Sequence, residues 1–271
     1  MRKFNFLFVL LFTLPILGFA QDDCENPDER RPICDPTFTR AEMTVHPIFD
    51  SNWEVTIDGK ADEGFWSKID PLDLPFDITD SWFTNSTFAA APSADYEVSW
   101  KITYDEDFLY LFGEVTDDAL VSRSLVTFNE SYACDNIELF TLFAGPDVIM
   151  PDWALGDATQ LRIYVDLNET TGDSLETGGF AAGIIGTEKY QPQGYKTKTV
   201  KTDKGYDVEV KIPFGLISGS FDDDDNYIPM DVKALTEFQF DINGADRDDV
   251  APEAEREYIW GWSATWNRDW G

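Results

Sequence analysis

The sequence predicts an all-β protein, an antiparallel β-sandwich of the two-sheet jelly-roll or immunoglobulin-like kind, formed as a single domain. Short runs in which apolar and polar residues alternate follow one another along the chain, separated by turn-forming residues, and this pattern is typical of half-buried strands. No long stretch has the 3.6-residue period of a helix. The chain has 271 residues, of which 43% are hydrophobic and 15% aromatic, enough for a core despite a net charge of −32.

The first residues have the composition of a removable signal peptide. Arg2 and Lys3 precede an apolar run over 4–20, which ends in small residues at Gly18 and Ala20. We expect residues 1–20 to be a signal peptide cleaved near Ala20, and the mature protein to be secreted or periplasmic.

Residues 21–41 lack any strand pattern and predict an irregular, proline-rich leader before a sandwich over 42–271. Cys24 and Cys34 lie in this leader and are candidates for a disulfide in an oxidising compartment. Cys134 falls in a strand-like run and is expected to be a buried thiol.

The strands follow from the alternation, which is clearest over 95–104. There Tyr96, Val98 and Trp100 share one face, and the acidic turn at 105–107 joins this run to the next strand as a hairpin. A second hairpin turns at Asp203–Gly205, and a helical turn is expected within 62–68. The predicted strands are 41–48, 95–104, 108–115, 136–143, 160–167, 195–201, 206–212, 238–243 and 257–262.

Charge and composition exclude several classes of function. A chain of net charge −32 lacks the clustered Lys and Arg with which proteins neutralise nucleic-acid phosphates or anionic membranes. No apolar stretch after the signal is long enough to cross a bilayer, so no membrane insertion is expected. The single histidine, His46, lies in a predicted strand, where a lone histidine is more often structural than catalytic, so we expect no His-based triad and no multi-histidine metal site. We predict a protein that is not an enzyme, and we expect it to be a monomer.

One acidic segment leaves an alternative open. The run Asp222–Asp225 fits a solvated loop, and it also fits a cation site built from clustered carboxylates.

Five segments, in this order, resemble the family 9 carbohydrate-binding modules. The segments are Ile57–Trp66, Val98–Asp117, Asp135–Phe140, Gly205–Phe214 and Phe240–Asp246, followed by the aromatic run Trp260–Ser263. The resemblance implies a sandwich fold and a secreted, non-catalytic carbohydrate-binding protein whose partner is a poly- or oligosaccharide. The alternatives are an accessory domain or member of a glycoside-hydrolysing system, and a purely structural or protein-binding sandwich. The resemblance also leaves haem binding open, because some similar sandwiches bind haem, and the candidate ligands would be His46, Met43, Met150 and Met230.

The resemblance also implies a site in which aromatic side chains clamp a sugar and polar groups fix its hydroxyls. It places Tyr132 on one side of the sugar and Trp266 or Trp270 on the other, with the alignment of the last two left open. The polar residues that it implies are Glu138, Gln160, Arg162 and Asn267. Gln160 and Arg162 alternate with apolar residues, so their side chains project from one face of the predicted strand.

The resemblance also implies structural Ca²⁺, which some relatives hold, so acidic residues are candidate ligands for it. The sequence does not identify which of these residues would bind the ion. Those expected at strand ends are Glu114, Asp117, Glu209, Asp241 and Asp246. Two tryptophans in the matching segments, Trp66 and Trp100, are expected in the core rather than at the sugar.

Overall fold

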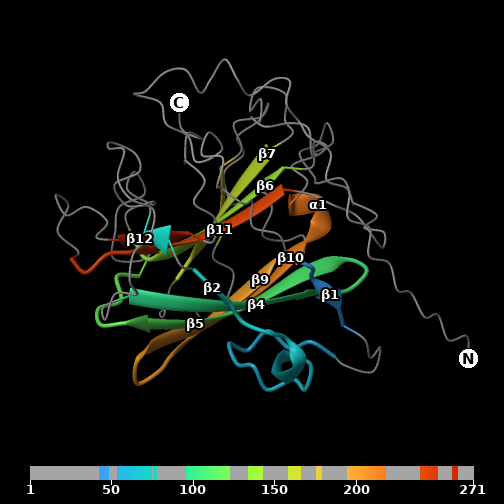
Figure 1. The fold of residues 1–271 in the computed structure, drawn as a ribbon, viewed down its shortest axis with the longest axis horizontal. Helices are drawn as coiled ribbons and strands as arrows, with labels where there is room; N and C mark the ends of the chain where they lie inside the picture. The colour runs from blue at the N-terminus through green and yellow to red at the C-terminus, as the bar shows by residue number, and fades with distance from the viewer. Residues whose placement is uncertain are drawn as a thin grey trace, which may run out of the picture. The chain divides into compact units, whose positions relative to one another are not determined.

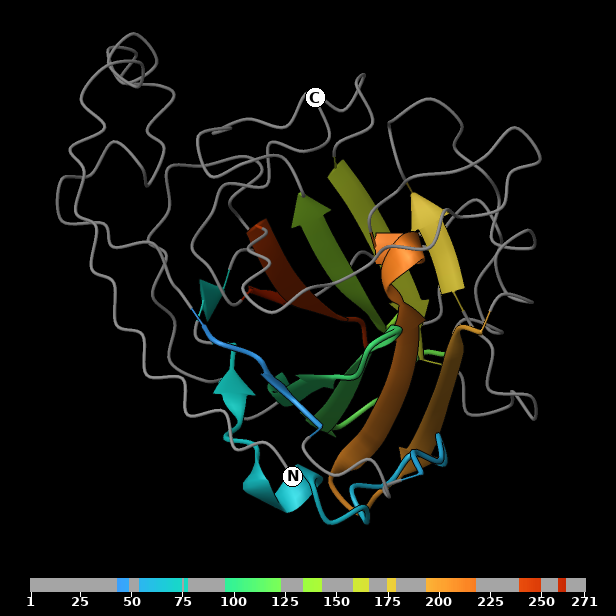
Figure 2. The same ribbon diagram turned by 90° about the vertical axis from the view of Figure 1, so that its right-hand side faces the viewer.

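A computed structural model shows a chain folded as two β-sheets that form separate layers (Figures 1 and 2). All of the described residues belong to a unit spanning Arg40–Gly271. They are residues 43–48, 54–74, 76–77, 96–122, 134–142, 158–165, 175–178, 194–217, 239–249 and 258–261.

The first sheet has the strand order β1-β4-β5-β10-β9, and β2 also pairs with β4. Its strands are β1 (His46–Pro47), β2 (Leu72–Asp73), β4 (Tyr96–Tyr104), β5 (Phe108–Asp117), β9 (Lys196–Lys201) and β10 (Gly205–Pro213). The hairpins β4–β5 and β9–β10 are antiparallel. The short β1 departs from the predicted antiparallel pattern, because it pairs with β4 in parallel.

The second sheet has the strand order β3-β12-β11-β6-β7-β8. Its strands are β3 (Phe76–Asp77), β6 (Asn136–Leu142), β7 (Ala158–Tyr164), β8 (Leu175–Gly178), β11 (Gln239–Asp246) and β12 (Tyr258–Gly261). Each described neighbour pair in this sheet is antiparallel. The two-sheet β-sandwich predicted from the sequence is therefore confirmed.

The main core lies between the two sheets and is built by strand alternation. In β4 the alternate residues Tyr96, Val98, Trp100 and Ile102 are buried, as predicted, and they pack with Leu139 of the second sheet in one cluster. Short helix α1 (Phe214–Ile217) follows β10 directly and adds three more apolar side chains to this cluster (Figure 2).

Trp100 requires a glycine beside it. Gly113 is its register partner on β5, and a Cβ added there would lie 2.5 Å from the indole ring. The absence of a side chain at Gly113 therefore leaves the space that the ring occupies.

A second, smaller cluster covers the outer face of the first sheet. The segment 54–70 crosses this face and packs Phe65 and Trp66 onto Tyr110 and Phe112, with the Trp66 and Phe112 rings 5.7 Å apart. Trp66 lies in a 3-10 helix, Trp66–Lys68, within the region where a helical turn was predicted. Trp66 and Trp100 are both 0% exposed, which confirms that they belong to the cores.

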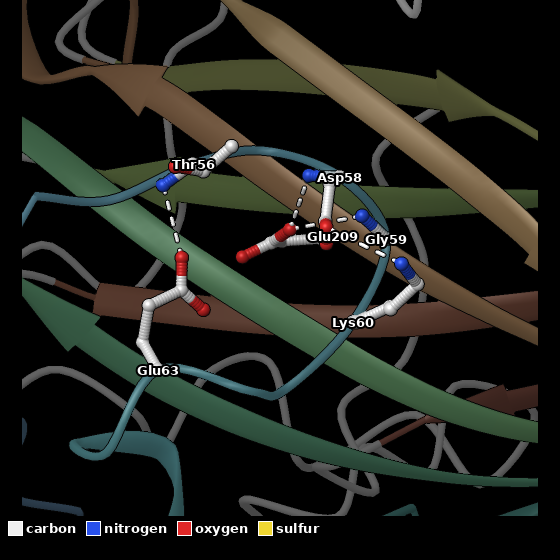
Figure 3. Close-up of polar contacts among 6 residues, drawn as sticks. All are labelled: Thr56, Asp58, Gly59, Lys60, Glu63 and Glu209. Carbon is white, nitrogen blue, oxygen red and sulfur yellow. Dashed lines mark hydrogen bonds and ion pairs between the residues drawn. The ribbon is translucent and has the colours of Figure 1, made fainter.

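A buried carboxylate fastens the same segment to β10. Glu209 Oε2 accepts hydrogen bonds from the backbone N–H groups of Asp58 and Gly59, at 2.9 and 3.0 Å. Glu63 closes the loop from the other side, where its Oε1 accepts a bond from the Thr56 N–H (Figure 3). Gly59 has φ +82°, so this turn favours glycine.

Strand β9 forms one edge of the first sheet. Along it, Thr197 and Thr199 are buried, while Lys196 and Lys201 at its two ends are exposed and Lys198 is half-buried. The edge of this very acidic chain is therefore lined with positive charge.

The long strands were predicted within a few residues, whereas the two-residue strands β2 and β3, strand β8 and helix α1 were not. Cys134 is fully buried, as expected. Residues 1–41, which include Cys24 and Cys34, lie outside the described residues, as do Asp222–Asp225, Met150 and Met230. Within the described part of the chain, no helix is long and apolar enough to cross a membrane.

Candidate functional site

A row of polar side chains crosses three strands of the second sheet. Glu138 on β6 is the register partner of Arg162 on β7 and of Asn243 on β11. Their neighbours in the strands, such as Leu139 and Leu161, belong to the core between the sheets. Since successive side chains point to opposite faces, the row lies on the outer face of this sheet.

Two members of the row form a buried ion pair. The Nε of Arg162 donates to Oε1 of Glu138 at 2.9 Å, and the two side chains are only 9% and 2% exposed. Desolvating two charges costs about as much as their attraction returns, so such a pair does not by itself stabilise a fold. Its chemistry suits a ligand with many hydroxyls, because a guanidinium offers donors in a fixed plane and a carboxylate offers acceptors.

The structure brings together only part of the site that the resemblance implied. Glu138 and Arg162 are in contact. The backbone of Gln160 lies two residues before Arg162 on β7, opposite Phe140, and its side chain is not among those described. The remaining implied residues, Tyr132, Trp266, Asn267 and Trp270, lie outside the described residues.

A second polar centre consists of three buried carboxylates. Asp117 ends β5 of the first sheet, Asp246 ends β11 of the second sheet, and Asp135 immediately precedes β6. One oxygen from each lies within 4.8 Å of the others. Asp135 is held by the backbone, since its Oδ1 accepts a bond from the Arg247 N–H and its Oδ2 accepts one from the Val121 N–H.

The electrostatics of this acidic centre favour a bound cation. Burial raises the pKa of Asp135 well above its ordinary value, and the negative charges of Asp117 and Asp246 raise it further. Burial also raises the pKa values of Tyr96 and Tyr206, and the negative charges of Asp135 and Asp117 raise both further. Clustered carboxylate oxygens are the ligands that hard cations such as Ca²⁺ prefer, so the donor set fits such an ion.

A more exposed group of carboxylates adjoins the acidic centre. Asp118 and Asp248, which are both exposed, share Asp117 with it. Asp117 therefore belongs to both groups of carboxylates, the buried one and the solvent-facing one.

The positions of the acidic residues were predicted from the sequence less accurately than the positions of the strands. Asp117 and Asp246 do end strands, as expected, whereas Glu114, Glu209 and Asp241 lie within strands. The prediction of strand ends was wrong for those three residues, each of which alternates with core residues and lies on the outer face of its sheet. Asp135 was not proposed as a ligand, although its place at the head of the motif Asp135–Phe140 marked it.

A family model matches most of the chain, including the segments that carry the polar row and the acidic centre. Residues 57–271 match the family described as "Carbohydrate family 9 binding domain-like". The chain belongs to this family. The resemblance inferred from five short segments is thereby confirmed.

Two curated relatives of this family 9 domain are named as glycan-degrading enzymes. The chain is 27% identical over 164 residues to "Endo-1,4-beta-xylanase A" of Thermoanaerobacterium saccharolyticum, which is 60% of this chain and 11% of that protein. It is 27% identical over 162 residues to "Exoglucanase XynX" of Acetivibrio thermocellus, which is 60% of this chain and 12% of that protein. The match therefore spans about a tenth of each relative.

Solved structures of family 9 modules share the fold. A module from Caldicellulosiruptor kristjanssonii in complex with glucose matches with a TM-score of 0.50 at 18% identity, over 80% of this chain and 84% of that one. A family 9 module from the same organism in complex with cellotriose matches with a TM-score of 0.50 at 17% identity, over 80% of this chain and 82% of that one. At these identities the likeness establishes the β-sandwich fold.

Proposed function

We propose that this domain binds a glycan on the outer face of its second sheet and catalyses no reaction. The observation that carries the proposal is the desolvated Glu138–Arg162 pair on that face, in a chain that belongs to a carbohydrate-binding family. Outer faces of sheets are ordinarily solvated, so a buried ion pair there marks a built site rather than ordinary packing.

The proposed ligand is held in two ways. Tyr132 and either Trp266 or Trp270 stack on the apolar faces of a sugar ring, and Glu138, Gln160, Arg162 and Asn267 bond to its hydroxyls. Glucose and cellotriose, which are bound in the structures that this chain resembles, are the first ligands to test.

A calorimetric titration with glucose, cellotriose and xylo-oligosaccharides tests the proposal. Tyr132→Ala should weaken binding by roughly 1–3 kcal/mol, the scale of a lost aromatic anchor. Trp266→Ala and Trp270→Ala decide between the two alignments. Only the variant that removes the stacking tryptophan should lose as much binding free energy as Tyr132→Ala.

Lys60→Ala serves as the matched control, because Lys60 lies on the segment that covers the other sheet and should bind as wild type does. A wild type that binds none of these sugars contradicts the proposal. Three aromatic variants that all bind like the wild type would show that the clamp is misplaced.

A second candidate role is that of an accessory domain in a glycoside-hydrolysing system. The names of the two curated relatives favour this role. Reducing-sugar release from xylan and cellulose should be absent with this chain alone, since we propose that it only binds. Release that survives rigorous purification would contradict the non-catalytic proposal.

We also propose that the acidic centre, Asp117, Asp135 and Asp246, holds a structural Ca²⁺. The support is the 4.8 Å grouping of three buried carboxylates and the preference of Ca²⁺ for such oxygen ligands. The ion would offset the mutual repulsion that burial leaves unscreened.

The N-terminal composition supports secretion. We propose that residues 1–20 are removed on export, and mass spectrometry of the exported protein should find a mature N-terminus near residue 21. A mature protein that retains residues 1–20 would contradict this proposal.

A further inference from the structure

Asn243 presents a buried polar atom that no described residue uses. The residue is 2% exposed, and its Oδ1 has no hydrogen-bond partner among the described residues. It lies in the middle of β11, directly opposite Glu138, in the row that continues to Arg162. It therefore shares the outer face with the ion pair.

A buried acceptor without a partner is costly. Leaving a carbonyl oxygen desolvated and unpaired costs about 1–3 kcal/mol, so such atoms are rare in folded proteins. Packing does not explain the amide either, because a leucine would fill similar space without an unpaired oxygen. The acceptor is best explained by a donor that arrives from outside the fold.

Sugar hydroxyls are donors of this kind. The neighbouring ion pair holds a donor and an acceptor in fixed positions, and Asn243 adds a further acceptor at the next strand, about 4.8 Å away across the sheet. Across three neighbouring strands, the row thus offers two acceptors and one donor to a ligand that carries hydroxyls on successive carbons.

We propose that Asn243 is a ligand-contact residue whose Oδ1 accepts a hydrogen bond from one hydroxyl of the bound glycan. This inference rests on the proposed sugar-binding function and adds to it a residue that sequence reasoning did not assign. Removal of that acceptor should therefore weaken binding of sugars that carry the hydroxyl, and not of sugars that lack it.

The test combines one substitution with single-hydroxyl changes in the ligand. Wild type and Asn243→Leu are titrated with glucose and with its 2-, 3-, 4- and 6-deoxy derivatives. Asn243→Leu should bind glucose about 10- to 100-fold more weakly. One deoxyglucose should bind wild type with a similar loss, and Asn243→Leu should bind that derivative no more weakly than it binds glucose.

The thermal melting of Asn243→Leu separates a contact role from a structural one. Because the substitution removes an unpaired oxygen, the melting temperature should stay level or rise while affinity falls. Should the leucine variant fail to fold, Asn243→Ala is titrated with the same sugars.

Thr197→Val is the matched control. Thr197 is 3% exposed, its Oγ1 also lacks a partner among the described residues, and it lies on β9 of the other sheet. This variant should keep the full affinity for glucose and the wild-type pattern across the deoxy series.

The outcomes are distinct. A wild type that binds neither glucose nor cellotriose overturns the proposed function, and this inference falls with it. If wild type binds and Asn243→Leu binds equally well, or loses affinity equally for glucose and every deoxy derivative, only the role of Asn243 is overturned.

Discussion

The Glu138–Arg162 ion pair has thermodynamic consequences at the scale of single residues. Arg162→Met would leave a carboxylate 2% exposed without its cation, and breaking a buried pair in this way costs about 3–5 kcal/mol of unfolding free energy. The double variant Glu138→Leu/Arg162→Met should recover most of that loss, because neither charge is then left buried. Urea denaturation of both variants measures the difference.

The contrasting control is the exposed pair Lys60–Asp58. Its Nζ–Oδ2 distance is 3.5 Å, and the side chains are 59% and 37% exposed. Lys60→Ala should change the unfolding free energy by less than about 1 kcal/mol. If Lys60→Ala and Arg162→Met lost equal amounts of unfolding free energy, burial would not explain the larger effect expected for Arg162→Met.

Residue identities at the site were predictable only where a motif carried them. Glu138 and Arg162 followed from the resemblance, and the alternation of β7 placed Arg162 on the outer face. Asn243 and Asp135 lie in matching segments but were not singled out as site residues, because those segments indicated strands and not which other strands would lie beside them. Their roles depend on register between strands far apart in sequence, such as Asn243 opposite Glu138.

At the scale of elements, Glu209 couples the segment 54–70 to β10 in a pH-dependent way. Burial raises its pKa from 4.5 to about 7, with the nearby charges of Glu63 and Asp58 adding to the effect and the N–H groups of Gly59 and Asp58 opposing it. The folded state therefore binds this proton more tightly than the unfolded chain does. The associated stabilisation is full below about pH 4.5 and is lost as the pH rises through about 7.

Glu209→Gln keeps an acceptor for the two backbone N–H groups and removes the titration. Relative to wild type, it should be more stable at pH 8 by on the order of 2–3 kcal/mol, and the difference should vanish near pH 4. Denaturation of both proteins across this range measures it. A difference independent of pH would show that Glu209 does not titrate as its burial suggests.

Strand prediction succeeded where the alternating pattern was long. Tyr96–Tyr104 and Gly205–Pro213 carry enough alternation to fix both their type and their buried face. By contrast β2 and β3 have two residues each, which is a single period of the pattern and too short to be recognised, so they are defined only by pairing with β4 and β12. The parallel pairing of β1 likewise depends on where the chain returns, and no local sequence feature encodes it.

At the scale of the molecule, the acidic centre joins the two sheets. Asp117 comes from the first sheet, whereas Asp135 and Asp246 come from the second, so a bound cation would tie the layers at one end. Saturating Ca²⁺ at 100 times its Kd adds about 2.7 kcal/mol to the unfolding free energy. EDTA should accordingly lower the melting temperature by several degrees, on the order of 2–4 °C per kcal/mol.

Asp135→Asn gives the matched comparison, because it removes charge while keeping a similar shape. This variant should melt at the same temperature with EDTA and with Ca²⁺. If wild type also melts identically in the two conditions, the acidic centre holds no Ca²⁺ under those conditions, and the structural-ion proposal is contradicted.

The charged edge at β9 affects how copies of this protein meet one another. An edge strand exposes unpaired backbone groups that could template intermolecular sheet growth, and lysines along it oppose such contacts by mutual repulsion. Lys196, Lys198 and Lys201 occupy this edge in a chain whose net charge is otherwise strongly negative. Because each copy also carries a strongly negative net charge, copies should repel one another at low salt, and added salt should weaken that repulsion.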